Sequence, residues 1–393
     1  MRVVYVSTDA GVPPFGRKGA SAHVQAILKQ LLRRGDEVHL VTSRPGPVPG
    51  EFPNLRVHAL PTPRGRDARS REVAARETDR TVAAVLDRLH ATGGIDLVYE
   101  RYALWGRTAM AWARARGVAG ILEVNAPLPL EQARHRLLAD PAGADAVARS
   151  VTADAEVVVC VSEPVAAWVR GLGGASPSSV HVVPNGVDTE RFRPVPPRSR
   201  PGHFTVGFVG TLKPWHGVQD LVEAVALLHA SDPTYRLLVV GDGPGRPALE
   251  DLAARRGLAG AIELTGGVPP SGVPRQVARM DVAVAPYPPT DDFYFSPLKI
   301  YEYLAAGVPV VASDVGPVPE LLGAGGEPIG ALYRAGCHPH LAATIIGLRH
   351  DPARRADLGR RARAAMVEGH DWSHVLQRTL DLSEVLHADA QAS

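Results

Sequence analysis

Two stretches of this 393-residue chain each alternate short apolar strand patterns with helical patterns. The first stretch opens at Val3 and the second opens at Phe204. Parallel strands need long crossovers between them, and helices usually supply these crossovers. The alternation therefore predicts an α/β fold with two parallel sheets, one in each of two domains of ordinary size.

Apolar runs, helical spacing and Gly or Pro breaks define the expected elements. The expected strands of the first stretch are Val3–Thr8, Glu37–Thr42, Arg56–Leu60, Leu97–Glu100, Gly120–Val124, Val157–Ser162 and Val180–Pro184. The second stretch starts with the run at Phe204 and continues with Leu237–Gly241, Ile262–Thr265, Val282–Pro286 and Val308–Ala312. We expect the first helix to begin at Ser21, with this serine as its N-cap.

The two predicted domains are separated by residues 191–202, where Pro and Arg dominate and no apolar period occurs. This linker divides a first domain of residues 1–190 from a second domain of residues 203–370. A last helix starts at Trp372 within residues 371–393, and such a tail can cross back onto the first domain.

The composition bounds the class of protein. Hydrophobic residues make up 45% and charged residues 21%, as in a soluble enzyme, and the net charge of +2 offers no basic surface for nucleic acid. Two cysteines without metal-like spacing argue against a disulfide scaffold and a cysteine zinc site. No signal-peptide pattern or 18-residue apolar run occurs, so we expect a cytoplasmic protein. The mixed charges of residues 64–90 predict a solvated helix, with peripheral membrane contact as the alternative.

Lysine is rare in this chain and stands in informative places. Of 43 basic residues only four are lysines, and the use of arginine elsewhere is typical of a GC-rich bacterial genome. Lys18, Lys213 and Lys299 lie in Gly- or Pro-marked loops beside expected strands, whereas Lys29 does not. Because a compact ammonium differs from a guanidinium fork, this placement indicates contacts with phosphate or hydroxyl groups.

The segment FSPLKIYEYLAAGVPVVAS, residues 295–313, predicts an anion site. Pro297 is expected at the first helical position, where its missing N–H costs no hydrogen bond. The free N–H groups of a helix start attract anions, and Lys299 adds a charge in the same turn. Glu302, one turn on, can accept hydrogen bonds from ribose hydroxyls. The segment fits a nucleoside diphosphate, and an ordinary α/β helix with a Pro start is the alternative.

Other polar loops also follow expected strands. FGRKGAS contains Gly16 and Gly19, and GTLKPWHG contains Lys213 and His216. In GDGP, Asp242 is expected to stabilise the turn. Because ligands bind beyond the carboxyl ends of parallel strands, the convergence of these loops favours a ligand site.

Four polar residues lie at the ends of two strands of the first domain, namely Glu100, Arg101, Glu123 and Asn125. We expect them to point into one space, with Glu131 one helix turn beyond. They are the candidates to hold an acceptor substrate.

With these motifs the chain resembles the retaining glycosyltransferases of family 4, which have the GT-B fold. The most specific segments are VSEPVAAWV, VHVVPNGVDTERFRP, VGDGPGRPALEDLA, DVAVAPY and SPLKIYEYLAAGVPVVAS. The resemblance covers nearly the whole chain. It implies two facing Rossmann-like domains with an interdomain cleft, a nucleotide-sugar donor held mainly by the second, an acceptor held mainly by the first, and no catalytic metal or other cofactor.

The resemblance assigns Glu302 to the ribose hydroxyls and Gly16 and Gly19 to the Gly-rich loop near the diphosphate. Together with the motifs above, it gives the full set of candidate residues. Expected donor-binding residues are Gly16, Lys18, Gly19, Thr211, His216, Ser296, Pro297, Leu298 and Glu302. Expected catalytic residues are Lys213, Lys299 and Asn125, and expected acceptor-binding residues are Glu100, Arg101, Glu123 and Glu131. The chain departs from the family pattern at three places. The family's first glutamate would fall on Tyr294, and its Arg and Lys pair would fall on Thr211 and His216. The family's acceptor-side histidine would fall near Asn125. Asp291 and Asp292 are out of register with that glutamate.

The expected activity is transfer of a sugar from a nucleoside diphosphate sugar, with a UDP-sugar as the expected donor, and with retention of anomeric configuration. The acceptor is a carbohydrate, a lipid-linked or a small-molecule hydroxyl compound in carbohydrate or natural-product biosynthesis. Three alternatives stay open: a sugar-nucleotide 2-epimerase, a non-glycosidic coupling enzyme of the same fold, and a non-catalytic nucleotide-sugar binding protein.

Overall fold

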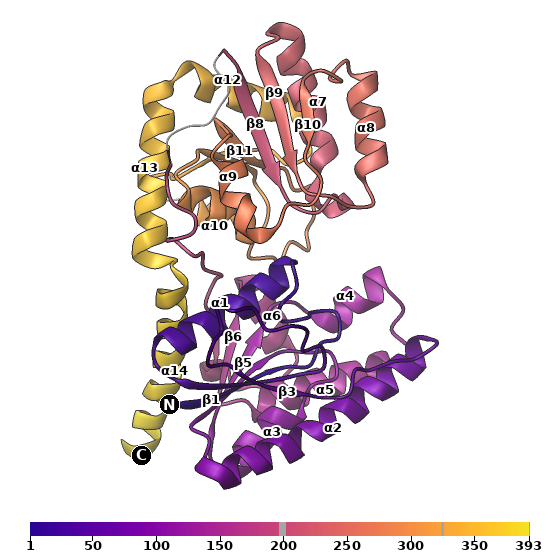
Figure 1. Cartoon of the computed structure of the whole chain (residues 1–393), viewed down its shortest axis with the longest axis vertical. Helices are drawn as coiled ribbons and strands as arrows, with labels where there is room; N and C mark the ends of the chain where they lie inside the picture. The colour runs from indigo at the N-terminus through magenta and orange to yellow at the C-terminus, as the bar shows by residue number, and fades with distance from the viewer. Residues whose placement is uncertain (196–201, 324–325, 393) are drawn as a thin grey trace. The chain divides into compact units, whose positions relative to one another are not determined.

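The computed structural model describes residues 1–195, 202–323 and 326–392, and it divides into two compact units (Figure 1). The first unit comprises Met1–Asn185, Tyr294–Ser296 and the chain from Trp372 onward. The second unit comprises Gly186–Phe293 and Pro297–Asp371. Part of the expected linker, residues 196–201, lies outside the described residues.

The first unit is built on a seven-stranded parallel sheet in the order β3-β2-β1-β4-β5-β6-β7. Its strands are β1 (Arg2–Ser7), β2 (Glu37–Thr42), β3 (Arg56–Ala59), β4 (Leu97–Arg101), β5 (Ala119–Val124), β6 (Val157–Cys160) and β7 (Val180–Val182). Its helices are α1 (Gly19–Arg33), α2 (Ala68–Gly93), α3 (Thr108–Arg116), α4 (Leu128–His135), α5 (Pro141–Asp154), α6 (Glu163–Gly171) and α14 (Trp372–Ala392).

The second unit has a six-stranded parallel sheet in the order β10-β9-β8-β11-β12-β13. Its strands are β8 (Phe204–Val209), β9 (Tyr235–Val240), β10 (Ile262–Leu264), β11 (Val282–Ala285), β12 (Val310–Ser313) and β13 (Ala331–Tyr333). Its helices are α7 (Val218–Ser231), α8 (Arg246–Arg255), α9 (Val273–Val277), α10 (Leu298–Ala305), α11 (Val318–Leu321), α12 (His338–His350) and α13 (Pro352–Gly369). The expected α/β class with two parallel sheets is confirmed, and β13, with only three residues, was missed.

Alternation along the strands separates two faces of the first sheet. Val4 and Val6 of β1 join an apolar cluster with Leu86 of α2 and Met110 of α3. Tyr5, between the two valines, stacks instead on a tyrosine of β4 on the other face. Successive strand side chains point to opposite faces, so both faces are buried and the strands read as continuous apolar runs.

Helix α14 packs beside α1 in the first unit. Trp372, Val375, Leu376 and Leu380 are buried, which gives the helix an apolar face. The charge-rich segment forms α2, whose Asp67 and Ser70 make a reciprocal capping box. None of the helices in the described ranges combines the length and the apolar character needed to span a membrane.

Two expected helix starts are wrong by one or two residues. Helix α1 begins at Gly19 with Lys18 as its N-cap, and the hydroxyl of Ser21 is buried without a hydrogen-bond partner among the described residues. Helix α10 begins at Leu298, because Pro297 has an extended backbone and occupies the N-cap. Boundaries are the least certain part of a sequence-based prediction, since cap geometry depends on the preceding loop.

Each sheet has a topological switch point, where the strand order reverses. In the first sheet it lies between β1 and β4, and in the second between β8 and β11. In open parallel sheets, ligands bind beyond the carboxyl ends of the strands at such a point. The two switch points therefore locate the regions in which the candidate residues must be judged.

Candidate functional site

Two glycine-rich loops of the second unit interlock beyond β8 and β9. Gly210 donates its N–H to Val240 at 2.9 Å, and Leu212 donates to Asp242 at 3.0 Å. A Cβ atom on Gly241 would lie 2.0 Å from the carbonyl oxygen of Gly210. The Asp242 side chain accepts from its neighbour Gly243, which agrees with the turn-stabilising role expected for it. The glycines are therefore needed for the close approach of two backbones.

Lys299 lies at the switch point of the second sheet. Its ammonium nitrogen, Nζ, is buried and has no hydrogen-bond partner among the described residues. It lies 4.2 Å from the ring centre of Phe208 in β8 and 5.3 Å from that of Tyr287, which follows β11. Burial lowers the pKa of Lys299 to about 7, and the nearby carboxylate of Glu302 opposes this shift. A buried cation whose hydrogen-bond donors are unused is suited to bind an anion.

Glu302 lies one turn beyond Lys299 in α10. Burial raises the pKa of the Glu302 carboxyl to about 7, and the positive charges of Arg191 and Lys299 oppose this rise. The pKa values of Lys299 and Glu302 are thus both close to 7, on neighbouring turns of one helix. Paired groups with oppositely shifted pKa values are typical of ligand sites, although ion pairs within a core also produce them.

His216 also lies close to Lys299. Burial and the Lys299 charge lower the pKa of His216 to about 3, so the imidazole is neutral, and its Nδ1 hydrogen-bonds with the carbonyl of Thr211. Lys213 lies 5.5 Å from the ring centre of Trp215 and is only partly buried, whereas Thr211 is exposed. Of the expected donor residues in this loop, His216 is the one that lies close to Lys299.

Gly217 closes this loop and has a positive φ of 61°. A Cβ atom here would lie 1.7 Å from the carbonyl oxygen of Pro286, in the loop beyond β11. We expect Gly217→Ala to lower the free energy of unfolding by at least ~2 kcal/mol, because left-handed backbone and steric overlap both oppose it. Urea unfolding measures the change. Gly347→Ala in α12 is the control, since a Cβ atom added there would have no other atom within 4 Å; equal stability of the two variants would contradict the prediction.

In the first unit, Glu123 is the centre of a buried hydrogen-bond cluster. His23 Nε2 lies 2.9 Å and the Tyr99 hydroxyl 2.6 Å from Glu123 Oε2. Arg101 donates to Glu123 Oε1 at 3.1 Å, and the side-chain amide of Asn125 also donates to Oε1. Burial alone would raise the pKa of Glu123, but His23, Arg101 and Tyr99, with His23 the strongest, lower it to about 2. The expectation that Arg101, Glu123 and Asn125 lie together is confirmed.

The expectation that Glu100 joins this group is wrong. Glu100 is fully buried on the other face of β4, next to Gly106 and Asp79. Burial is the main cause of a strongly raised pKa of Glu100; the Asp79 charge adds to it, and the backbone at Met110 opposes it. Neighbouring strand residues point to opposite faces, so Glu100 and Arg101 could not both meet one acceptor.

The remaining expected residues are more dispersed. Gly16 packs tightly, because its Cβ would lie 2.6 Å from the hydroxyl oxygen of Ser21, while Lys18 and Gly19 are exposed at the start of α1. Ser296 belongs to the first unit, where its hydroxyl and carbonyl oxygens accept from Asn185 at 3.0 and 2.7 Å.

Tyr294, at the position of the family's first glutamate, donates its hydroxyl to Glu131 at 3.0 Å, and both residues belong to the first unit. Asp291 and Asp292 are exposed. In the described part of the chain, no three His, Cys, Asp or Glu side chains are grouped as metal ligands would be.

Sequence reasoning missed four residues that complete these groups: His23, Tyr99, Phe208 and Tyr287. Strand alternation could have placed Tyr99 on the face of Arg101, because the two are separated by two positions. His23 lies on the buried side of α1, whose facing strand cannot be identified from the sequence.

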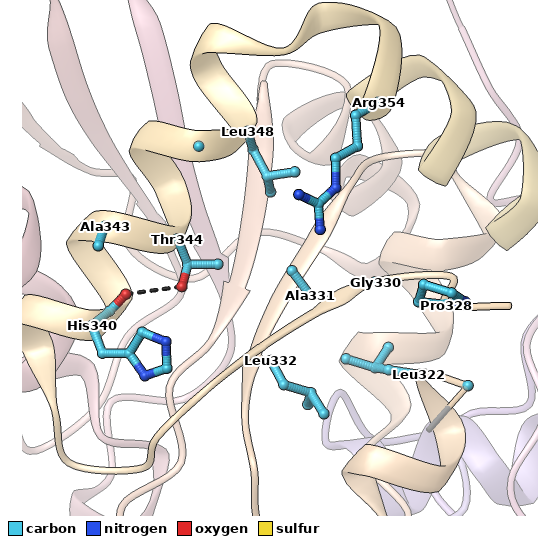
Figure 2. Close-up of a pocket in the computed structure, with 12 residues that line it drawn as sticks. Leu322, Pro328, Gly330, Ala331, Leu332, His340, Ala343, Thr344, Leu348 and Arg354 are labelled. Carbon is cyan, nitrogen blue, oxygen red and sulfur yellow. Dashed lines mark hydrogen bonds between the residues drawn. The ribbon is translucent and has the colours of Figure 1, made fainter. Parts of the chain in front are cut away.

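A separate cavity of about 510 Å³ lies between α12, β13 and the end of α11 (Figure 2). Leu322, Leu332 and Leu348 line it, and Arg354 and His340 supply polar groups. None of the residues expected at the donor or acceptor site lines this cavity. The buried polar groups, rather than the cavity, therefore identify the candidate site.

Comparison with known proteins shows the family of the chain. The family described as Glycosyltransferase Family 4 matches residues 17–191, and the family described as Glycosyl transferases group 1 matches residues 203–351. The D-inositol 3-phosphate glycosyltransferase of Actinosynnema mirum is 30% identical over 328 residues, which cover 77% of each chain. The MMP alpha-(1->4)-mannosyltransferase of Mycolicibacterium hassiacum is 31% identical over 211 residues, which cover 53% of this chain and 49%, about half, of that relative.

A solved structure shows the same fold. The Anabaena protein HepE, crystallised in complex with UDP and glucose, superposes with a TM-score of 0.70 at 18% identity, over 97% of this chain and 98% of HepE. The likeness covers both Rossmann-like domains. The chain therefore belongs to the family 4 glycosyltransferases, also described as glycosyl transferases group 1, and has the GT-B fold.

Proposed function

We propose that this glycosyltransferase moves a sugar from a nucleoside diphosphate sugar to an acceptor hydroxyl, with retention of the anomeric configuration and without a metal ion. The observation that carries the proposal is the buried ammonium of Lys299 at the switch point of the second sheet, which has no hydrogen-bond partner in the described part of the chain. The donor diphosphate is the group that fits it, because it brings two or more negative charges to a site with free donors. Glu302 accepts from the ribose hydroxyls.

In this proposal, bond breaking is driven by stabilisation of the leaving group. The bond between the anomeric carbon and the phosphate oxygen breaks, and negative charge accumulates on the departing diphosphate. Lys299 and the backbone N–H groups of Leu298 and Lys299 at the start of α10 receive that charge, and losing one such donor costs roughly 3–4 kcal/mol of barrier. Lys213 is the second candidate cation, on the adjacent loop.

The acceptor oxygen forms the new bond to the anomeric carbon on the face that the phosphate leaves. Its proton passes to the departing phosphate oxygen, so no protein nucleophile is required and the anomeric configuration is kept. Arg101, Asn125 and Glu131, beyond the strands of the first unit, bind the acceptor. The UDP bound to HepE supports uridine as the base, and the name of the inositol phosphate relative supports a polyhydroxyl acceptor.

A panel of nucleotides tests the donor. We expect UDP and UDP-glucose to raise the thermal midpoint more than GDP, ADP or uridine, because a ligand of the folded state stabilises it by mass action. The control is the same panel with EDTA added, and the rise is expected to persist. No rise with any nucleoside diphosphate would contradict the proposal.

Product analysis tests the reaction. UDP-glucose and GDP-mannose are offered alone and with D-inositol 3-phosphate, glucose 1-phosphate or methyl α-glucoside. A new glycoside that forms only with acceptor supports transfer, and NMR of its anomeric proton reads the configuration. Epimerised donor in the absence of acceptor would favour the epimerase, and nucleotide binding without turnover would favour a binding protein.

A further inference from the structure

The hydrogen-bond capacity of Glu123 is completely used. An ionised carboxylate accepts at about four lone-pair positions and donates nothing. Oxygen Oε1 accepts from Arg101 and Asn125, and Oε2 accepts from Tyr99 and is paired with His23. Glu123 is 2% exposed, so its carboxylate is shielded from solvent. Each of the four neighbours is consequently fixed in orientation by one buried group.

This arrangement determines which way the Asn125 amide faces. An amide has one oxygen and one NH₂ group, and only the NH₂ group can face a carboxylate that accepts alone. The Asn125 oxygen is therefore directed away from Glu123, and this residue is only partly buried at the carboxyl end of β5. An amide oxygen in that position can accept a hydrogen bond from a hydroxyl group.

We propose that Glu123 is a positioning residue of the acceptor site: it holds Asn125 by its N–H so that the amide oxygen accepts a hydrogen bond from the acceptor hydroxyl. This inference rests on the proposed function and adds to it the direction of one hydrogen bond between protein and substrate. Asn125 presents an acceptor and not a donor, so the substrate group that it meets is a hydroxyl and not a phosphate oxygen. Arg101 is held in the same network, with its charge balanced by the carboxylate.

Three substitutions test the inference in the full chain. Asn125→Ala removes the amide, and Glu123→Met fills the same space but cannot accept a hydrogen bond from the Asn125 amide. Glu123→Gln keeps this hydrogen bond, because its side-chain oxygen still faces Asn125. Its amide NH₂ then faces Tyr99 and His23, both of which can accept. Glu72→Gln is the matched control, since Glu72 is a buried carboxylate of α2 that accepts from the N–H of Ala139.

The acceptor of the panel with the highest wild-type turnover is the probe, with UDP-glucose as donor. We expect Asn125→Ala and Glu123→Met each to lower kcat/KM for the acceptor about tenfold or more, with the KM for donor unchanged. Glu123→Gln is expected to keep most of the acceptor kcat/KM, and Glu72→Gln all of it.

The double variant Glu123→Met with Asn125→Ala separates positioning from general support of the fold. If Glu123 acts through Asn125, the double variant loses no more than Glu123→Met alone, because both changes remove one interaction. Losses that multiply, or equal losses in donor and acceptor kinetics, would overturn the inference. If Glu123→Met fails to fold, Asn125→Ala decides alone: wild-type acceptor kinetics in that variant overturn it.

The failure of this inference differs from the failure of the proposed function. A wild-type protein that glycosylates no acceptor in the panel contradicts the proposed function and this inference with it. Wild-type transfer that survives Asn125→Ala unchanged contradicts this inference and the acceptor-binding role of Asn125, but it leaves the proposed transfer reaction standing.

Discussion

Lys299→Met is expected to lower turnover by about a hundredfold or more while the protein stays folded. Lys299 has no hydrogen-bond partner to lose among the described residues, and its Nζ lies near the rings of Phe208 and Tyr287. Methionine has a similar length and adapts to irregular apolar space, so the aromatic surroundings keep their contacts. Removal of a buried charge also removes its desolvation cost. Steady-state transfer assays and thermal midpoints, measured together, check both parts of this result.

Two further variants sharpen the test. Lys299→Arg is not expected to restore turnover, because a planar guanidinium fork does not fit the space of a compact ammonium between two rings. Lys29→Met in α1 of the first unit is the control for loss of a lysine and is expected to leave turnover unchanged. Near-normal turnover of Lys299→Met would remove Lys299 from the mechanism, whereas loss of folding would refute the description of its surroundings.

Glu100→Gln is expected to stabilise the protein, and increasingly so as the pH rises. The pKa of Glu100 is raised in the folded chain above its ordinary value of 4.5. Below pH 4.5 the carboxyl is protonated in both states and contributes no pH dependence. Above it, the unfolded chain loses its proton first, so stability falls by as much as about 1.4 kcal/mol per pH unit up to the folded pKa. Glutamine does not titrate, so the Glu100→Gln variant lacks this fall in stability with rising pH.

Urea unfolding at pH 5 and pH 8 measures the effect. The stability advantage of Glu100→Gln over wild type should be larger at pH 8 than at pH 5. Glu51→Gln, in an exposed loop, is the control and should follow the wild-type pH dependence. Parallel pH profiles of wild type and Glu100→Gln would show that Glu100 is not buried as described.

Most strands could be predicted because β1, β5 and β8 are buried on both faces and read as short apolar runs between Gly, Pro and polar breaks. The three-residue strand β13 could not, since its pattern is too short to differ from a loop. The placement of α14 in the first unit also depends on long-range packing, of which Trp372 alone gives no sign.

The candidate site was only partly predictable. Lys299 and Glu302 share one helix, so their spacing alone brings them together. His23 and Glu123 are a hundred positions apart and meet only because α1 lies over β5. Glu100 was assigned to the wrong face because the expected strand ended at Glu100, one residue before the end of β4 at Arg101, and the alternation along the strand was not applied.

The chain passes between its two units at four places: after Asn185, before Tyr294, after Ser296, and before Trp372. A ribosome therefore synthesises α14, which packs beside α1 in the first unit, only after the entire C-terminal sheet. During translation, the flank of α1 that α14 will occupy stays open until α14 emerges. No single proteolytic cut can release either half intact, and a fragment that ends at Asn185 would expose the apolar surface on which Leu376 and Leu380 rest.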